Sequence, residues 1–171
     1  MMTEMDASQC KTLVLGLGNT ILTDDGVGIY VARSIRRRME NENIVYKEAS
    51  MGGLELLELM KGFDRAIVID AIQTGKHEVG SLVKLRIEDL GGGSALARHQ
   101  VGFQEALELG RKLGMELPEE IAIYGIEVKD ILTFGESCTP EVEGCLPQIV
   151  ETIMKNEFPL KSTDEWGKHG G

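Results

Sequence analysis

The feature of this chain that most constrains its fold is an uninterrupted apolar run, Thr12–Leu17, followed at once by a glycine-containing turn. A run without polar alternation is typical of a β-strand that is covered on both faces in a parallel sheet. Apolar residues with helical spacing follow, and they predict a helix over about residues 27–39. In open α/β sheets ligands bind outside the carboxyl ends of the strands. The connecting turn, with Asn19, Asp24 and Asp25, is therefore the expected place for chemistry.

The rest of the sequence continues the alternation of strands and helices. Residues 65–70 form another wholly apolar run and end on a carboxylate, whereas residues 80–87 alternate and suit an antiparallel edge strand with one face in water. We therefore expect an α/β domain of three layers, with a mostly parallel twisted sheet of about five strands, helices on both faces and an antiparallel edge strand. The further strands are expected at residues 43–49 and 121–128, and the further helices at residues 54–61, 100–114 and from 139 onward.

The last predicted helix carries two proline signals. Thr139 and Pro140 suit a hydroxyl N-cap followed by proline at the first helical position. Pro147 inside the helix predicts a kink or break near Glu143. The chain becomes polar after this helix, so we expect residues 1–156 to form a single α/β domain and residues 157–171 to be a flexible C-terminal tail.

Composition narrows the classes of function. The net charge of −10 argues against a nucleic-acid partner. Positive residues gather only at the end of the first predicted helix, where complementing the helix dipole is a better explanation than a phosphate or RNA patch: Arg33, Arg36, Arg37 and Arg38. No apolar stretch approaches the roughly 18 residues of a membrane span, and the amino terminus does not resemble a signal peptide. Cys10, Cys138 and Cys145 form no CxxC motif and suit free thiols. We therefore expect a cytoplasmic monomer with no membrane and no nucleic-acid partner.

Asp25, Asp70 and His99 are the candidate metal ligands. Each follows a predicted strand or directly precedes a predicted helix, so the three side chains can converge on one edge of the sheet. Two carboxylates and an imidazole suit nickel, iron or zinc, because calcium takes more oxygen ligands and structural zinc takes more sulfur. Each residue also has a structural interpretation. Asp25 or His99 could cap its own helix, and Asp70 could hydrogen-bond a neighbouring loop.

The glycines of the first turn allow a competing interpretation as a dinucleotide site. Gly16 and Gly18 match the first two glycines of a Rossmann fingerprint, and Glu48 lies at a distance that suits the ribose-binding acid. Ile21, however, occupies the position of the third glycine, and acidic residues follow where a pyrophosphate would sit. The dinucleotide interpretation is therefore disfavoured.

Several separated motifs resemble those of the hydrogenase maturation peptidases, which cut a tail from the large subunit of nickel-iron hydrogenases. The opening motif of that family is Gly-x-Gly-Asn, a short apolar stretch, two acids and Gly-x-Gly, and all of it occurs between Gly16 and Gly28. The resemblance extends over about residues 12–155. The later matching motifs are Gly52-Gly53-Leu54, Ile69-Asp70-Ala71, His99-Gln100 and Thr139-Pro140-Glu141-Val142.

The resemblance implies an endopeptidase that removes the C-terminal extension of a nickel-iron hydrogenase large-subunit precursor after nickel insertion. The nickel-binding residues of the family correspond to Asp25, Asp70 and His99, which we take as both metal and catalytic residues. The nickel is carried by the substrate, so the implied partner is the nickel-loaded precursor. His77 adds an imidazole in the loop after Asp70, for which a surface position is the favoured explanation.

Other classes of function share part of this pattern. Peptidyl-tRNA hydrolases have the Gly-Leu-Gly-Asn opening found at residues 16–19 and an Arg-His-Asn-Val-Gly element similar to residues 98–102, but there the two elements lie close together in sequence. A non-enzymatic nickel-binding accessory protein would use the same ligands without cleavage. A thiol protease would use Cys138 beside a helix N-terminus, but the base that could pair with it, His99, already belongs to the predicted metal site.

Overall fold

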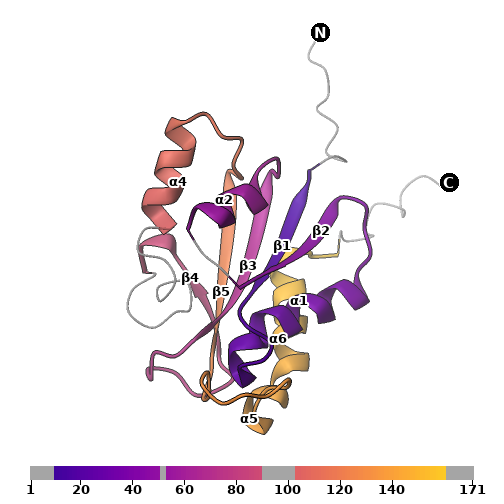
Figure 1. Cartoon of the computed structure of the whole chain (residues 1–171). Coiled ribbons are helices and arrows are strands. Elements are labelled where there is room, and N and C mark those ends of the chain that lie inside the picture. Colours follow the sequence, from indigo (N-terminus) through magenta and orange to yellow (C-terminus); the bar gives the residue numbers. More distant parts are fainter. Residues whose placement is uncertain (1–9, 51–52, 90–102, 161–171) are drawn as a thin grey trace, which may run out of the picture.

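A computed structural model describes residues 10–50, 53–89 and 103–160 of the chain. These residues contain a five-stranded sheet in the order β2-β1-β3-β5-β4 (Figure 1). Four strands are parallel, and β4 pairs with β5 in the antiparallel direction at one edge. The predicted fold class, including its antiparallel edge strand, is confirmed. The strands are β1 (Thr12–Leu17), β2 (Ile44–Ala49), β3 (Arg65–Ile72), β4 (Leu82–Leu85) and β5 (Glu120–Glu127).

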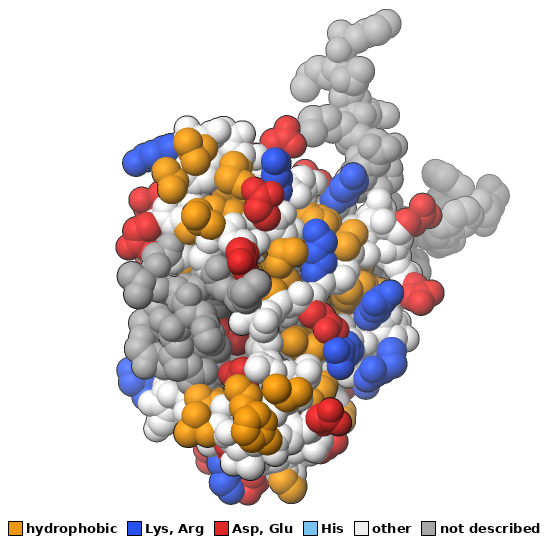
Figure 2. All heavy atoms as spheres, in the orientation of Figure 1, with side chains coloured by type: hydrophobic (Ala, Val, Ile, Leu, Met, Phe, Trp, Pro, Cys, Tyr) orange, Lys and Arg blue, Asp and Glu red, His pale blue; other side chains and the backbone are white. Residues whose placement is uncertain are grey.

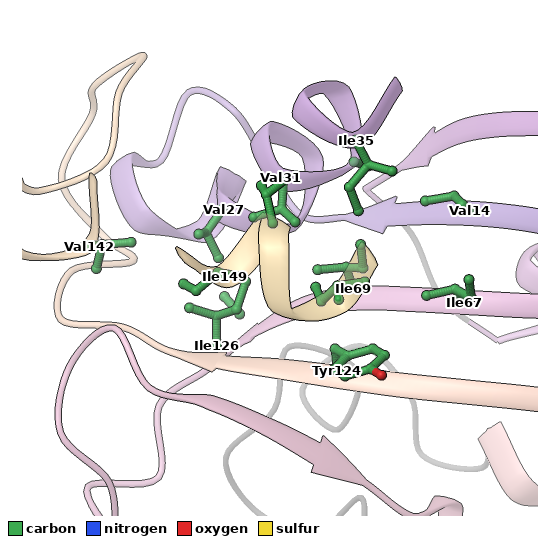
Figure 3. Close-up of a cluster of buried hydrophobic side chains, with 14 of the residues drawn as sticks. Val14, Val27, Val31, Ile35, Ile67, Ile69, Tyr124, Ile126, Val142 and Ile149 are labelled. Carbon is green, nitrogen blue, oxygen red and sulfur yellow. The ribbon is translucent and has the colours of Figure 1, made fainter. Parts of the chain in front are cut away.

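Helices cover both faces of the sheet (Figure 1). The first hydrophobic cluster joins one face of the sheet to α1 and α6, and the second joins the other face to α2 and α4. Figure 3 shows the first cluster, in which Val31, Ile149 and Ile69 converge from α1, α6 and β3. No helix in the described ranges is long and apolar enough to cross a membrane. The helices are η1 (Thr23–Gly26), α1 (Val27–Arg38), α2 (Leu54–Met60), η2 (Ile87–Asp89), α4 (Phe103–Lys112), α5 (Pro140–Glu143) and α6 (Leu146–Glu157).

The central strands are buried on both faces, as their unbroken apolar runs predict. All six residues of β1 are buried, and so are the last seven of β3. Because successive side chains point to opposite faces, Val14 enters the cluster with α1 and α6, while Leu13 and Leu15 enter the cluster with α2 and α4. The sheet is therefore the middle layer of three.

Two strands differ from the prediction by two or more residues in length. β3 runs two residues beyond Asp70, because it stays paired with β5 as far as Ile72 and Glu127. The edge strand β4 is shorter than the predicted range of residues 80–87, since its pairing with β5 ends at Leu85 and the chain then enters η2.

The predicted break in the last helix is confirmed, but the predicted cap is wrong. Helix α5 ends at Glu143, and α6 begins at Leu146, with Pro147 in its first turn. Thr139 occupies the N-cap position of α5, yet its hydroxyl makes no capping bond. The hydroxyl instead donates to the Asp24 carboxylate at 3.0 Å.

A buried acid, Glu157, fixes the end of α6 to the sheet. Its carboxylate accepts hydrogen bonds from the Tyr124 hydroxyl and the Arg65 guanidinium, and it lies 3.3 Å from the Lys84 ammonium. Burial and the nearby Glu157 raise the pKa of Tyr124 to about 12. Glu157, the first residue of the predicted tail, thus belongs to α6, and residues 161–171 lie outside the described residues.

Helix α1 packs very close to the sheet because two contacting residues have no side chain. A Cβ atom at Gly28 would lie 2.2 Å from the carbonyl oxygen of Ile69 and 2.6 Å from that of Leu17. A Cβ atom at Gly16 would lie 2.7 Å from the Gly28 carbonyl oxygen. This contact sets the height of α1 above β1 and β3, and with it the position of the acidic turn that precedes the helix.

We expect Gly28→Ala to lower the free energy of unfolding by about 3 kcal/mol or more, because the new methyl group would overlap two backbone carbonyls that cannot move independently. Urea denaturation followed by circular dichroism measures the change. Gly144→Ala is the matched control. Gly144 has a helical backbone, and its added Cβ would lie 3.3 Å from the nearest atom, so a change within about 1 kcal/mol is expected. Equal stability of the two variants would contradict the close-packing argument.

Candidate active site

The candidate site lies at the carboxyl edge of the sheet, where β1 ends. Gly18 has a φ of +135°, which side chains rarely adopt, and a Cβ there would lie 1.9 Å from the Asp25 carbonyl oxygen. The backbone of the turn after β1 therefore presses directly against η1. Because of this contact, the acidic pair Asp24 and Asp25 lies beside the carboxyl end of β1.

Asp25 is oriented by the backbone of that turn. The residue is 6% exposed, and its Oδ2 accepts a hydrogen bond from the Asn19 N–H at 3.0 Å. The side-chain oxygen of Asn19 in turn accepts the N–H of Ile21 at 3.1 Å. Asn19 thus fixes both the Asp25 carboxylate and the backbone of Ile21.

Asp70 lies at the same edge, on the neighbouring strand. It is buried, and its Oδ1 accepts a hydrogen bond from the Ala71 N–H at 2.8 Å. It directly follows Ile69, which pairs with Gly16 of β1 in the sheet register. The expectation that Asp70 ends its strand is wrong by two residues, because β3 continues to Ile72.

Asp25 and Asp70 therefore reach the carboxyl edge from separate segments. Gly28, three residues after Asp25, rests against the carbonyl of Ile69, the residue before Asp70. His99, the third predicted residue, lies outside the described residues, so the three-residue cluster stays a prediction. Among the described ranges no group of three His, Cys, Asp or Glu side chains could hold a metal ion, a statement that does not extend to His99.

Asp24, the other acid of the pair, has a structural role. It is completely buried, and its donors lie at both ends of the β5–α5 loop, residues 128–139. Asp24 therefore closes this loop against η1, a role that the sequence did not predict. The carboxylate accepts hydrogen bonds from the N–H groups of Lys129 (3.1 Å), Asp130 (3.0 Å) and Thr139 (2.7 Å) and from the Thr139 hydroxyl (3.0 Å).

Further hydrogen bonds join the β5–α5 loop to η1 and α1. The Thr23 N–H donates to the carbonyl of Gly135 at 3.0 Å, and the Thr23 hydroxyl donates to the carbonyl of Thr133. The Tyr30 hydroxyl donates to the carbonyl of Glu136 at 2.7 Å. The loop and the turn after β1 therefore form one hydrogen-bonded unit.

A further buried acid, Glu127, fixes the loop that follows β3. Its Oε1 accepts the N–H groups of Thr74 and Gly75, and its Oε2 accepts the Thr74 hydroxyl, each at 2.8 Å. The sequence does not reveal this role of Glu127, because an acid at the end of an apolar strand has no motif that identifies partners in a distant loop. His77 lies in this loop and is exposed.

The structure disfavours a cysteine nucleophile. Burial raises the pKa of the Cys138 thiol to about 12, and the charges of Asp24 and Glu143 add to the rise. A thiol with such a pKa is protonated at neutral pH and is a poor nucleophile. Cys145 is half-buried against the first hydrophobic cluster, and Cys10 is exposed.

Solved structures of hydrogenase maturation enzymes share this fold. The hydrogenase maturating endopeptidase HybD from Escherichia coli has a TM-score of 0.69 and 25% identity, and the match covers 85% of this chain and 91% of that chain. The [NiFe] hydrogenase maturation protease HybD from Thermococcus kodakarensis has a TM-score of 0.64 and 25% identity, with coverage of 85% and 98%. The chain therefore has the α/β fold of these maturation endopeptidases.

The sequence comparisons give the family. The family model described as hydrogenase maturation protease matches residues 29–156. The hydrogenase expression/formation protein HupD from Rhizobium leguminosarum bv. viciae is 30% identical over 149 residues, covering 85% of this chain and 73% of the relative. The hydrogenase 2 maturation protease of Escherichia coli strain K12 is 28% identical over 147 residues, with coverage of 84% and 88%. The chain belongs to the hydrogenase maturation protease family, as its motifs predict.

We expect the two acids of the pair to differ in their effect on stability. Asp24→Asn replaces one acceptor oxygen by a donor amide, leaves a buried N–H of the β5–α5 loop without its acceptor, and should lower the free energy of unfolding by about 2–4 kcal/mol. Asp25→Asn should change it by less than about 1 kcal/mol, since a site built for function gains little stability from its charge. Urea unfolding of both variants measures the difference, and equal losses would contradict the assignment of roles.

Cys138→Ala should retain cleavage activity, because the thiol is protonated at the pH of the reaction. The expected cost is limited to stability, at about 1 kcal/mol for a buried side chain that becomes smaller. In the folded protein Cys138 should also resist iodoacetamide at pH values up to 9.0, the ordinary thiol pKa, while Cys10 reacts. Loss of cleavage with an intact fold would instead support a thiol mechanism.

Proposed function

We propose that this protein is the endopeptidase that removes the C-terminal extension of a nickel-iron hydrogenase large-subunit precursor after nickel has been inserted. The observation that carries the proposal is the pair of nearly buried carboxylates, Asp25 and Asp70, at the carboxyl edge of a hydrogenase maturation protease fold. The nickel belongs to the substrate. The partner is therefore the metal-loaded precursor, and the apo enzyme carries the ligands that recognise it.

The charges at this edge support recognition of a cation. Asp25 and Asp70 are 6% and 1% exposed, so water screens them poorly. A divalent cation that arrives with the precursor would be attracted to both carboxylates, and an imidazole would complete a ligand set typical of nickel, iron or zinc. We assign that imidazole to His99, on the basis of its place in the family motif.

Metal recognition can act as a checkpoint for cleavage. Binding energy between the inserted nickel and the two carboxylates would hold the scissile peptide bond in place only when the precursor is loaded. Cleavage then adds water across that bond and produces a new carboxylate and a new amine. A carboxylate of the site can accept the proton of the attacking water, or the nickel can polarise the scissile carbonyl.

Cleavage should depend on nickel in the precursor and on the three proposed residues. We expect the wild-type protein to process nickel-loaded precursor and to leave nickel-free precursor uncut. Asp25→Asn and His99→Ala should each lower the cleavage rate by at least about 100-fold, because the scissile bond loses its alignment. Cleavage is measured by gel mobility and by the mass of the released peptide.

His77→Ala is the matched control for His99→Ala, because His77 is exposed in the loop after β3 and should have no role in cleavage. Circular dichroism of each variant tests that the fold is intact. Equal cutting of nickel-free precursor, or full activity of His99→Ala, would contradict the proposal. Nickel-dependent binding of the precursor without any cleavage would instead indicate a non-enzymatic accessory protein.

A further inference from the structure

Three large apolar side chains are exposed at the carboxyl edge of the sheet. Leu132 and Phe134 of the β5–α5 loop are each 81% exposed, and Ile21 of the turn after β1 is 49% exposed. Figure 2 shows hydrophobic side chains gathered at the lower end of the molecule, where Figure 1 places the start of α1 and α5. We name Ile21, Leu132 and Phe134 the apolar rim.

Hydrogen bonds hold the two segments of the apolar rim together. The Gly135 N–H donates to the carbonyl of Ile21 at 3.0 Å, and Leu22 forms a parallel β-bridge with Gly135. Within the loop, the Asp130 carboxylate accepts the N–H of Leu132 at 3.0 Å. The rim therefore has a fixed shape although its side chains lie in solvent.

A fixed apolar surface favours binding for two reasons. The loop is already ordered by Asp24, Thr23 and Tyr30, so a partner that covers the rim does not have to order it. Apolar surface removed from water then contributes directly to affinity. Apolar residues scattered singly on a surface need no explanation, but Ile21 is hydrogen-bonded to the residue that follows Phe134, so these exposed side chains form a group.

We propose that the apolar rim is the docking surface for apolar residues of the hydrogenase large-subunit precursor that flank the bond to be cleaved. This inference rests on the proposed function. Asn19 connects the rim to the candidate site, because its N–H donates to Asp25 and its side-chain oxygen accepts the N–H of Ile21. A polypeptide held at Asp25 therefore lies within reach of the rim.

Other occupants fit the surface less well. The first and last described residues, 10 and 160, lie near the amino ends of the parallel strands, opposite the rim. There the Lys11 N–H donates to Asp64, and Arg65 binds Glu157. Neither of these ends is therefore close to the rim. A second copy of the chain would bring together two molecules with a net charge of −10 each, whose repulsion opposes association.

The test compares Leu132→Ser and Phe134→Ser with the wild type in cleavage of nickel-loaded precursor. We expect KM to rise about tenfold for each variant while kcat changes by less than about twofold, because the rim binds the precursor equally in the ground and transition states. Leu113→Ser is the matched control. Leu113 is 71% exposed but follows α4, away from the site, and its KM should stay at the wild-type value.

Each outcome has a distinct meaning. If the wild type cleaves the precursor and the rim variants keep its KM, the docking proposal is overturned and the proposed function stands. If the wild type neither binds nor cleaves the precursor, both fail together. Sedimentation velocity tests whether a second copy of the chain covers the rim. A wild-type dimer that Phe134→Ser converts to a monomer would assign the rim to self-association. If Leu132→Ser and Phe134→Ser instead lower the melting temperature and leave KM unchanged, the apolar rim is covered by a segment of the same chain.

Discussion

One buried carboxylate holds together the part of the molecule that the candidate site needs. Asp24 accepts N–H groups from Lys129 and Asp130 at the start of the β5–α5 loop and from Thr139 at its end. Because the N–H groups are fixed in the backbone and the acid is fully buried, the loop cannot move away without leaving a charge and several donors unsatisfied in the interior. The exposed rim and the turn that carries Asp25 both depend on this arrangement.

The adjacent acids Asp24 and Asp25 have different roles because their side chains point in different directions from η1. In η1 consecutive side chains point in different directions, so Asp24 faces the β5–α5 loop while Asp25 accepts the Asn19 N–H at the end of β1. The close approach of Gly18 to Asp25 and of Gly28 to Ile69 brings η1 and α1 close to the sheet. A short, tightly packed turn can therefore join a structural anchor and a candidate functional group in two successive residues.

The sequence predicted those features that depend on local patterns. The buried strands β1 and β3 follow from unbroken apolar runs, and the break before α6 follows from Pro147, because a strand period or a proline acts within a few residues. The partners of Asp24 and Glu127 could not be predicted, since they lie in distant loops that no spacing rule connects. The Thr139 cap failed for the same reason: a local rule assigned the hydroxyl to its own helix, and a distant carboxylate competes for it.

The buried acids Glu157, Asp24 and Glu127 have different kinds of partner at the two ends of the sheet. At the amino ends of the parallel strands, Glu157 is paired with the guanidinium of Arg65 and the ammonium of Lys84, which balance its charge. At the carboxyl edge the donors to Asp24 and Glu127 are backbone N–H and hydroxyl groups, which stabilise a carboxylate without cancelling its charge. Asp24 and Glu127 are therefore held by hydrogen-bond dipoles, whereas Glu157 is held by ion pairs. Under the proposed function, a divalent cation presented there by a protein substrate would approach two buried acids, Asp24 and Glu127, whose donors are dipoles rather than ions.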